Sequence, residues 1–232
     1  TIPGHAALDD SSWRTSVVDG QGTLYAISFG QEGYYGVGIQ ESSVQSGQWL
    51  PAENVANGDP GVPGYSGTSF RGFIGVGYNG AACVLYGGDN GAARAASRPP
   101  GVPWSEVAST AGLSSLKVRS SPTQVSMVAN STGCASAAWW GTDDATIRIA
   151  DFASGSGVWR DYPRGPLTAG GTLAADPILR SDQAGNQTLI WTAIRPETVP
   201  GQSTQVPIRH LYVSQRPAGG DWSDRQAPRR LS

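Results

Sequence analysis

The residues of this 232-residue chain that could do chemistry are mostly acids, arginines and tyrosines in segments rich in turn residues. Carboxylates and guanidinium groups gathered at one end of a fold can hydrogen-bond the hydroxyl groups of a ligand, and carboxylates can also hold a cation. Aromatic rings nearby would add apolar contact area. The sequence therefore predicts a ligand-binding surface, with these residues as candidates: Tyr34, Tyr35, Tyr65, Asp89, Asp143, Asp144, Arg148, Arg195, Glu197 and Arg209.

Motifs for catalysis and for tight metal binding are absent from the sequence. The two histidines, His5 and His210, are too few and too far apart for a zinc site or a convincing Ser-His-Asp arrangement, and no nucleophile elbow, Walker loop or dinucleotide fingerprint occurs. We predict no catalytic residue and no cofactor, and we leave metal binding open. A hydrolase or lyase that uses loop carboxylates is kept as an alternative. His210 is expected to be a strand residue with a hydrogen-bond partner.

An internal repeat determines which elements must position the candidate residues. A tryptophan preceded by a glycine-containing turn recurs at Trp49, Trp104, Trp159 and Trp222, with spacings of 55, 55 and 63 residues. Before each tryptophan, a glycine turn leads into a short apolar run. A repeat of this period is typical of stacked supersecondary units, in which the recurring tryptophan serves packing.

Each repeat has room for four short strands. In the third repeat we expect strands at 124–129, 134–140, 145–151 and 159–162, separated by turns. Abundant glycine and proline, and the lack of any helical apolar stripe, predict almost no helix. The predicted fold is an all-β, four-bladed β-propeller of four-stranded blades, with a β-sandwich as the second choice.

The blades are expected at about 12–58, 67–112, 121–167 and 174–232, within a single domain that spans 1–232. All the long connections fall at one end of the strands, at 56–69, 109–123, 165–176 and 193–207. Long loops in a compact domain are commonly functional. We therefore place the binding surface on this end.

The last repeat, from Asp176 through Gly185 and Trp191 to Trp222, resembles the blades of secreted bacterial propellers, including lectin-like ones. The single lysine against fifteen arginines is similar to the composition of proteins from high-GC, actinobacterial-like genomes. This resemblance implies glycan binding through an arginine, an acid and a tryptophan in each blade. Such residues do not repeat cleanly here, which predicts one or two sites. A secreted protein-binding or inhibitor propeller is the alternative from a different class.

Charge and hydropathy restrict the partners. The net charge of −2 and the lack of basic runs interleaved with aromatics argue against nucleic acid, and no apolar stretch is long enough to cross a membrane. The chain starts at Thr1, which suggests a processed N-terminus and a secreted, extracellular protein after signal-peptide removal. The expected partner is a glycan or a secreted protein. The sequence does not predict an oligomeric state.

Cys83 and Cys134 are the two cysteines. An even number in an exported protein favours a disulfide, whereas their equal parity after Gly80 and Gly133 directs both side chains to the same face of their own blades. Both alternatives stay open.

Overall fold

The computed structural model describes a set of segments that together contain sixteen strands, and the statements below concern these segments. They are residues 14–29, 37–43, 47, 53–55, 72–87, 92–104, 110–117, 125–130, 135–140, 147–153, 158–162, 172–201, 203–222 and 227–231.

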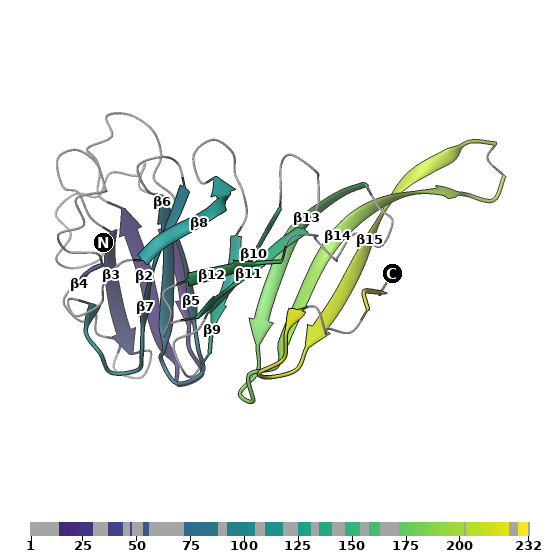
Figure 1. Ribbon diagram of the computed structural model, residues 1–232. Coiled ribbons are helices and arrows are strands. Elements are labelled where there is room, and N and C mark those ends of the chain that lie inside the picture. Colours follow the sequence, from purple (N-terminus) through teal and green to yellow (C-terminus); the bar gives the residue numbers. More distant parts are fainter. Residues whose placement is uncertain are drawn as a thin grey trace. The chain divides into compact units, whose positions relative to one another are not determined.

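The strands form four antiparallel sheets, each built from four consecutive strands (Figure 1). The first sheet contains β1 (Arg14–Val18), β2 (Thr23–Phe29), β3 (Val37–Ser43) and β4 (Glu53–Val55). The second contains β5 (Gly72–Val76), β6 (Ala82–Gly87), β7 (Ala92–Arg98) and β8 (Thr110–Lys117). The third contains β9 (Val125–Ala129), β10 (Ala135–Trp140), β11 (Ile147–Ala153) and β12 (Val158–Asp161). The fourth contains β13 (Thr172–Ser181), β14 (Gln187–Thr198), β15 (Gln205–Arg216) and β16 (Arg229–Arg230).

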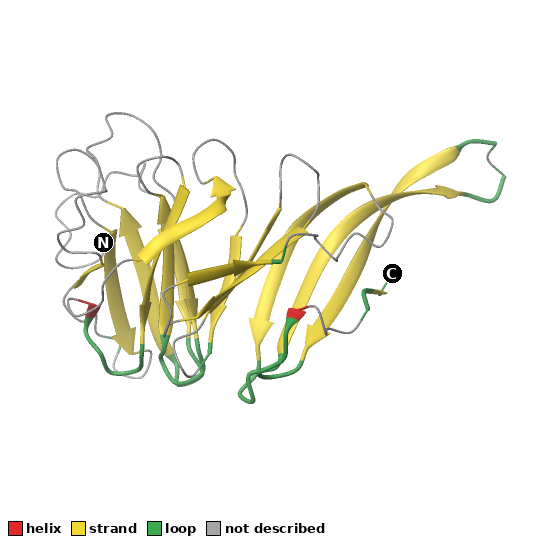
Figure 2. Cartoon of the chain, in the orientation of Figure 1, coloured by secondary structure: helices red, strands yellow, loops and turns green. Residues whose placement is uncertain are grey.

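The predicted fold class, an all-β chain of four propeller blades, is confirmed. Each sheet runs up and down in sequence order, as a propeller blade does, without the Greek-key crossing of a sandwich. In the third sheet the strands lie within two residues of the expected limits at all eight ends. The only helical turns in the described segments contain Trp104 and Trp222 (Figure 2). The blade limits and the single domain stay predictions.

The first two strands of a sheet are joined by the same tight turn in three of the sheets. The Asp19 N–H donates to the Thr23 carbonyl at 3.0 Å, and the Gly22 N–H donates to the Asp19 carbonyl at 3.3 Å. The turns at Gly77 to Ala81 and at Asp182 to Asn186 repeat both hydrogen bonds. The fourth residue of each turn is a glycine with φ between 85 and 88°, a left-handed conformation in which a β-carbon would be strained.

The chain divides into two compact units, and each is described separately below. The first contains residues 1–121, 128–135 and 152–159, and the second contains 122–127, 136–151 and 160–232. In the first unit, the run from Ala81 to Leu85 is completely buried. In the second, Leu189, Trp191 and Trp222 are completely buried. Apolar burial of this extent is what stabilises sheets of short strands.

The repeated tryptophans serve packing where the structure describes them. Trp104 and Trp222 are almost fully buried, and Trp159 packs against Phe152 with ring centroids 5.2 Å apart. Trp49 lies outside the described residues.

Cys83 is buried on β6, where its thiol lies 4.0 Å from the Val84 carbonyl oxygen. Cys134 also lies outside the described residues, so the disulfide stays a prediction. Among the residues that the structure describes, no helix is long and apolar enough to cross a membrane.

Candidate functional site

Four of the ten predicted binding residues lie on described strands. Arg148 is half-buried on β11, Arg195 and Glu197 are on β14, and Arg209 is exposed on β15. The other six lie outside the described residues: Tyr34, Tyr35, Tyr65, Asp89, Asp143 and Asp144.

The long β14–β15 hairpin separates its predicted residues onto two faces. Twelve cross-strand pairs join the strands without a register shift, from Gln187 and Arg216 to Thr198 and Gln205. Successive side chains point to opposite sides of a strand. Arg195 and Glu197 therefore lie on the face that also carries buried Trp191, here called the inner face. Arg209 lies on the opposite, outer face, across from Ile194.

Glu197 is held on the inner face from two other strands. Its Oε1 lies 3.0 Å from His210 Nε2 on β15 and 2.5 Å from Arg230 Nη1 on β16. His210 is buried, as expected for a strand residue, whereas the Glu197 side chain is 31% exposed and that of Arg230 is 43% exposed. Within the described segments, the second carboxylate oxygen of Glu197 has no partner. This oxygen is therefore a fixed acceptor that a ligand could reach.

Two aromatic side chains lie on the same face, deeper in the sheet. Trp191 and Tyr212 are directly paired across the strands and stack with ring centroids 5.7 Å apart and an interplanar angle of 20°. Both are almost completely buried, and neither the Trp191 indole N–H nor the Tyr212 hydroxyl has a hydrogen-bond partner among the described residues. Buried donors of this kind are normally satisfied by ordered water or by a ligand.

This arrangement can bind a polar ligand. The inner face offers one carboxylate acceptor, the guanidinium groups of Arg195 and Arg230, and two buried donors beside them. The described segments contain no group of three or more histidine, cysteine or acidic residues that could hold a metal ion. The chemistry supported by these residues is hydrogen bonding and ion pairing.

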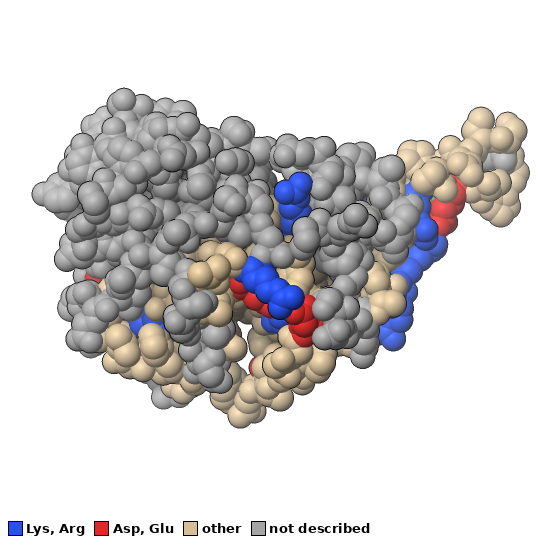
Figure 3. Space-filling view, viewed as in Figure 1, with Lys and Arg blue, Asp and Glu red and all other residues tan. Residues whose placement is uncertain are grey.

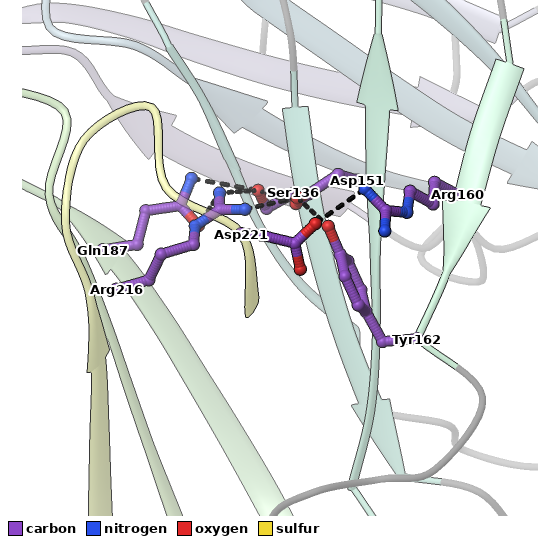
Figure 4. Close-up of polar contacts among 7 residues, drawn as sticks. All are labelled: Ser136, Asp151, Arg160, Tyr162, Gln187, Arg216 and Asp221. Atoms are coloured by element: carbon purple, nitrogen blue, oxygen red, sulfur yellow. Dashed lines mark hydrogen bonds and ion pairs between the residues drawn. The ribbon is translucent and has the colours of Figure 1, made fainter. Parts of the chain in front are cut away.

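A second polar cluster, not predicted from the sequence, lies at the other end of the strands (Figure 4). The Arg216 guanidinium forms an ion pair with Asp151 and donates to Ser136 Oγ at 2.9 Å and to Gln187 Oε1 at 2.6 Å. The Ser136 hydroxyl donates to Asp151 Oδ1 at 2.5 Å, and Gln187 Nε2 donates to Ser136 Oγ at 2.9 Å. We call these four residues the Arg216 cluster. Its hydrogen bonds run between β10, β11, β14 and β15.

Tyr162 borders the Arg216 cluster on its more exposed side. Its hydroxyl donates to Asp151 Oδ2 at 3.0 Å, and Arg160, which is paired with Asp221 at 2.6 Å, lies over its ring (Figure 4). Partial burial, followed by the negative charge of Asp151 and the hydrogen bond to it, raises the pKa of the Tyr162 phenol well above its ordinary value. The phenol therefore stays protonated and keeps its role as a donor to Asp151.

The Arg216 cluster serves structure more than ligand binding. Ser136, Gln187 and Arg216 are all buried, and their polar groups are occupied by one another. A buried and mutually satisfied network of this kind fixes a specific packing of strands. The sequence feature that could have indicated the Arg216 cluster is the motif Arg216-Pro-Ala-Gly-Gly-Asp-Trp222. It repeats the pattern of Arg98-Pro-Pro-Gly-Val-Pro-Trp104.

No family model matches the sequence, and no curated protein matches it either. Comparison with solved structures finds similar chains at low identity. A fucose-specific lectin from Aleuria aurantia is 14% identical, with a TM-score of 0.48 over 94% of this chain and 60% of the lectin. An ulvan lyase of polysaccharide lyase family PL25 is 13% identical, with a TM-score of 0.47 over 86% of this chain and 52% of the lyase.

The SapL1 lectin, solved in complex with α-methyl fucoside, is 15% identical, with a TM-score of 0.42 over 94% of this chain and 81% of the lectin. The chain thus spans 60% of the length of the Aleuria aurantia lectin to which it is similar.

Proposed function

We propose that the chain is a secreted glycan-binding module and that the inner face of the β14–β15 hairpin is its binding site. The observation that carries the proposal is the geometry of Glu197. One of its carboxylate oxygens is paired with Arg230 and lies 3.0 Å from His210 Nε2, and the side chain remains 31% exposed. A fixed carboxylate can accept hydrogen bonds from sugar hydroxyls at little entropic cost, because its conformation is already set.

Trp191 and Tyr212 support the same proposal. Sugar hydroxyls and ring oxygens can accept hydrogen bonds, so a glycan can satisfy these buried donors through a bridging water. Because both aromatic rings are buried, they serve as a rigid floor under the polar groups. The polar groups of Glu197, Arg230 and Arg195 would make the direct contacts.

A glycan array followed by calorimetry of the best ligand tests this proposal. We expect Glu197→Gln to weaken binding about tenfold, because the neutral amide replaces a charged acceptor and loses the ion pairs that fix it. Tyr212→Phe should weaken binding by a smaller factor. Gln215→Ala, an exposed change on the outer face of the same sheet, is the matched control and should leave binding unchanged.

Two results would reject the proposal. The first is an array on which no glycan binds the folded protein. The second is a bound glycan whose affinity is unaffected by both Glu197→Gln and Tyr212→Phe, since binding would then take place elsewhere on the chain.

Protein binding is the second candidate function, and the outer face of the fourth sheet favours it. Ile178, Leu211 and Leu231 are 46%, 36% and 50% exposed there. Ile178 is paired with Ile190, which is in turn paired with Val213, so these residues continue the apolar surface across three strands. Exposed apolar patches commonly mark protein contacts. A secreted protein whose capture is lost on Leu211→Glu but retained on Glu197→Gln would support this candidate.

A further inference from the structure

We infer that the glycan bound at the inner face is an anionic polysaccharide, one that carries carboxylate or sulfate groups along its chain. This inference rests on the proposed function, and it identifies the class of glycan. It is drawn from the distribution of charge on the fourth sheet. Four arginines, Arg195, Arg209, Arg229 and Arg230, lie on β14, β15 and β16 away from the Arg216 cluster.

The acids on this part of the sheet are fewer. Glu197 is the one acid on β14, β15 and β16. Four positive charges less one negative charge leave a local charge of +3 on these strands outside the Arg216 cluster, in a chain whose net charge is −2. Figure 3 shows arginine side chains gathered along the projecting hairpin, beside a smaller acidic group. The surface potential around the hairpin therefore attracts anions.

The register places these charges at regular positions on the two faces. On the inner face, Arg195 is opposite Ile208 and Arg230 is opposite Tyr212. On the outer face lie Arg209 and Arg229, which is opposite Val213. With two arginines on each face, a polymer that carries an acidic group on successive residues can contact more than one of them.

The chemistry of the inner face favours a glycan over other polyanions. Arginine pairs well with carboxylate and sulfate oxygens, while the open oxygen of Glu197 accepts from neighbouring hydroxyls, which a polysaccharide carries beside its charges. Single-stranded nucleic acid binds to exposed aromatic platforms, whereas Trp191 and Tyr212 are buried.

Matched pairs of polysaccharides test the inference. Binding of the full chain is measured for polygalacturonate against its fully methyl-esterified form, and for dextran sulfate against dextran. We expect the charged member of at least one pair to bind at least about tenfold more tightly. Its affinity should fall about tenfold from about 50 mM to about 500 mM NaCl, because salt screens exposed charges.

Arginine variants test whether the preference for charged polysaccharides depends on the inner face. Arg195→Gln combined with Arg230→Gln should weaken binding of the charged polymer about tenfold and leave its neutral partner unaffected or bound more weakly by a smaller factor. Arg160→Gln is the matched control, because Arg160 is a highly exposed, paired arginine on β12. It should leave all affinities unchanged.

The remaining outcomes separate this inference from the proposed function. A neutral glycan that binds in a Glu197-dependent way, with no preference for charged forms, would overturn the inference and leave the proposed function standing. Failure of every glycan to bind would overturn both. Binding of a DNA duplex as tight as that of the best charged polysaccharide would show general polyanion binding and would also overturn the inference.

Discussion

Two buried arginines, one in each compact unit, occupy the same local motif and yet have different surroundings. Arg98 ends β7 and Arg216 ends β15, and each is followed by proline, a glycine turn and, six residues later, a buried tryptophan. In both, the guanidinium carbon lies 5.0 Å from the centre of that tryptophan ring. The local sequence alone is therefore sufficient to place an arginine over a tryptophan.

The difference comes from the strands beside each motif. Arg216 is directly paired with Gln187, and its guanidinium reaches Asp151 and Ser136. Arg98 is paired with Ala82 instead, and its guanidinium lies over the ring of Tyr25 at 5.8 Å. Tyr25 in turn donates to Asp19, which holds the first tight turn. Side chains far away in sequence thus decide which groups surround the same arginine.

The largest predicted effect is on the unfolding free energy, and it tests the difference between the surroundings of the two arginines. Arg216→Met should destabilise the protein by about 3 kcal/mol, because it leaves the Asp151 carboxylate without its ion-pair partner. Arg98→Met should cost about 1 kcal/mol through loss of its cation–π contacts with Trp104 and Tyr25. Urea unfolding followed by tryptophan fluorescence measures both. Equal losses would contradict the proposed difference between the two arginines.

A double-mutant cycle sharpens the same comparison. Combining Arg216→Met with Asp151→Asn should cost about 2 kcal/mol less than the sum of the two single changes, since the residues share one ion pair. Additive costs would show that Arg216 does not stabilise the protein through Asp151.

Substituting one turn glycine in each compact unit should give a smaller difference, this time in the thermal midpoint of unfolding. Gly80 and Gly185 both have positive φ, so alanine at either position costs about 1 kcal/mol in backbone strain. A β-carbon at Gly80 would also lie 3.2 Å from the Tyr25 hydroxyl and disturb its bond to Asp19, whereas at Gly185 it would make an ordinary contact with Ala218. Gly80→Ala should therefore lower the thermal midpoint more than Gly185→Ala, and the reverse order would argue against the Tyr25–Asp19 contact.

The smallest expected effect concerns alkaline pH. The raised pKa of Tyr162 in the folded protein means that the unfolded chain loses this proton first as the pH rises past the ordinary tyrosine value of 10.0. The folded state then binds more protons than the unfolded state, so the unfolding free energy decreases with pH above that value. Solvent screening reduces the effect because the ring is only partly buried. Tyr162→Phe should show a shallower loss of stability between about pH 9 and about pH 11. An unchanged slope would mean that the pKa of the Tyr162 phenol is not raised in the folded protein.

The fold was largely predictable from the sequence, because turns and apolar runs recur with one period. Gly22, Gly80 and Gly185 occupy turns whose backbone requires glycine, and the runs between turns are too short for anything but strands. The site was less predictable. The sequence identified Arg195, Glu197 and Arg209 as neighbours, yet the alternation of side chains along β14 and β15 separates Arg209 from the other two.

The amino-acid sequence by itself determined the strands and turns and the two arginine–tryptophan motifs, because each of these depends on residues less than about ten positions apart, and the repeat is the recurrence of these local patterns. Only the tertiary structure decided that Glu197 is held by His210 and Arg230, and that Arg216 meets Asp151 and Ser136. Those contacts join residues 13 to 80 positions apart, and they depend on strand register and on which strands pack together. Register is a property of the paired strands, and no single segment contains it.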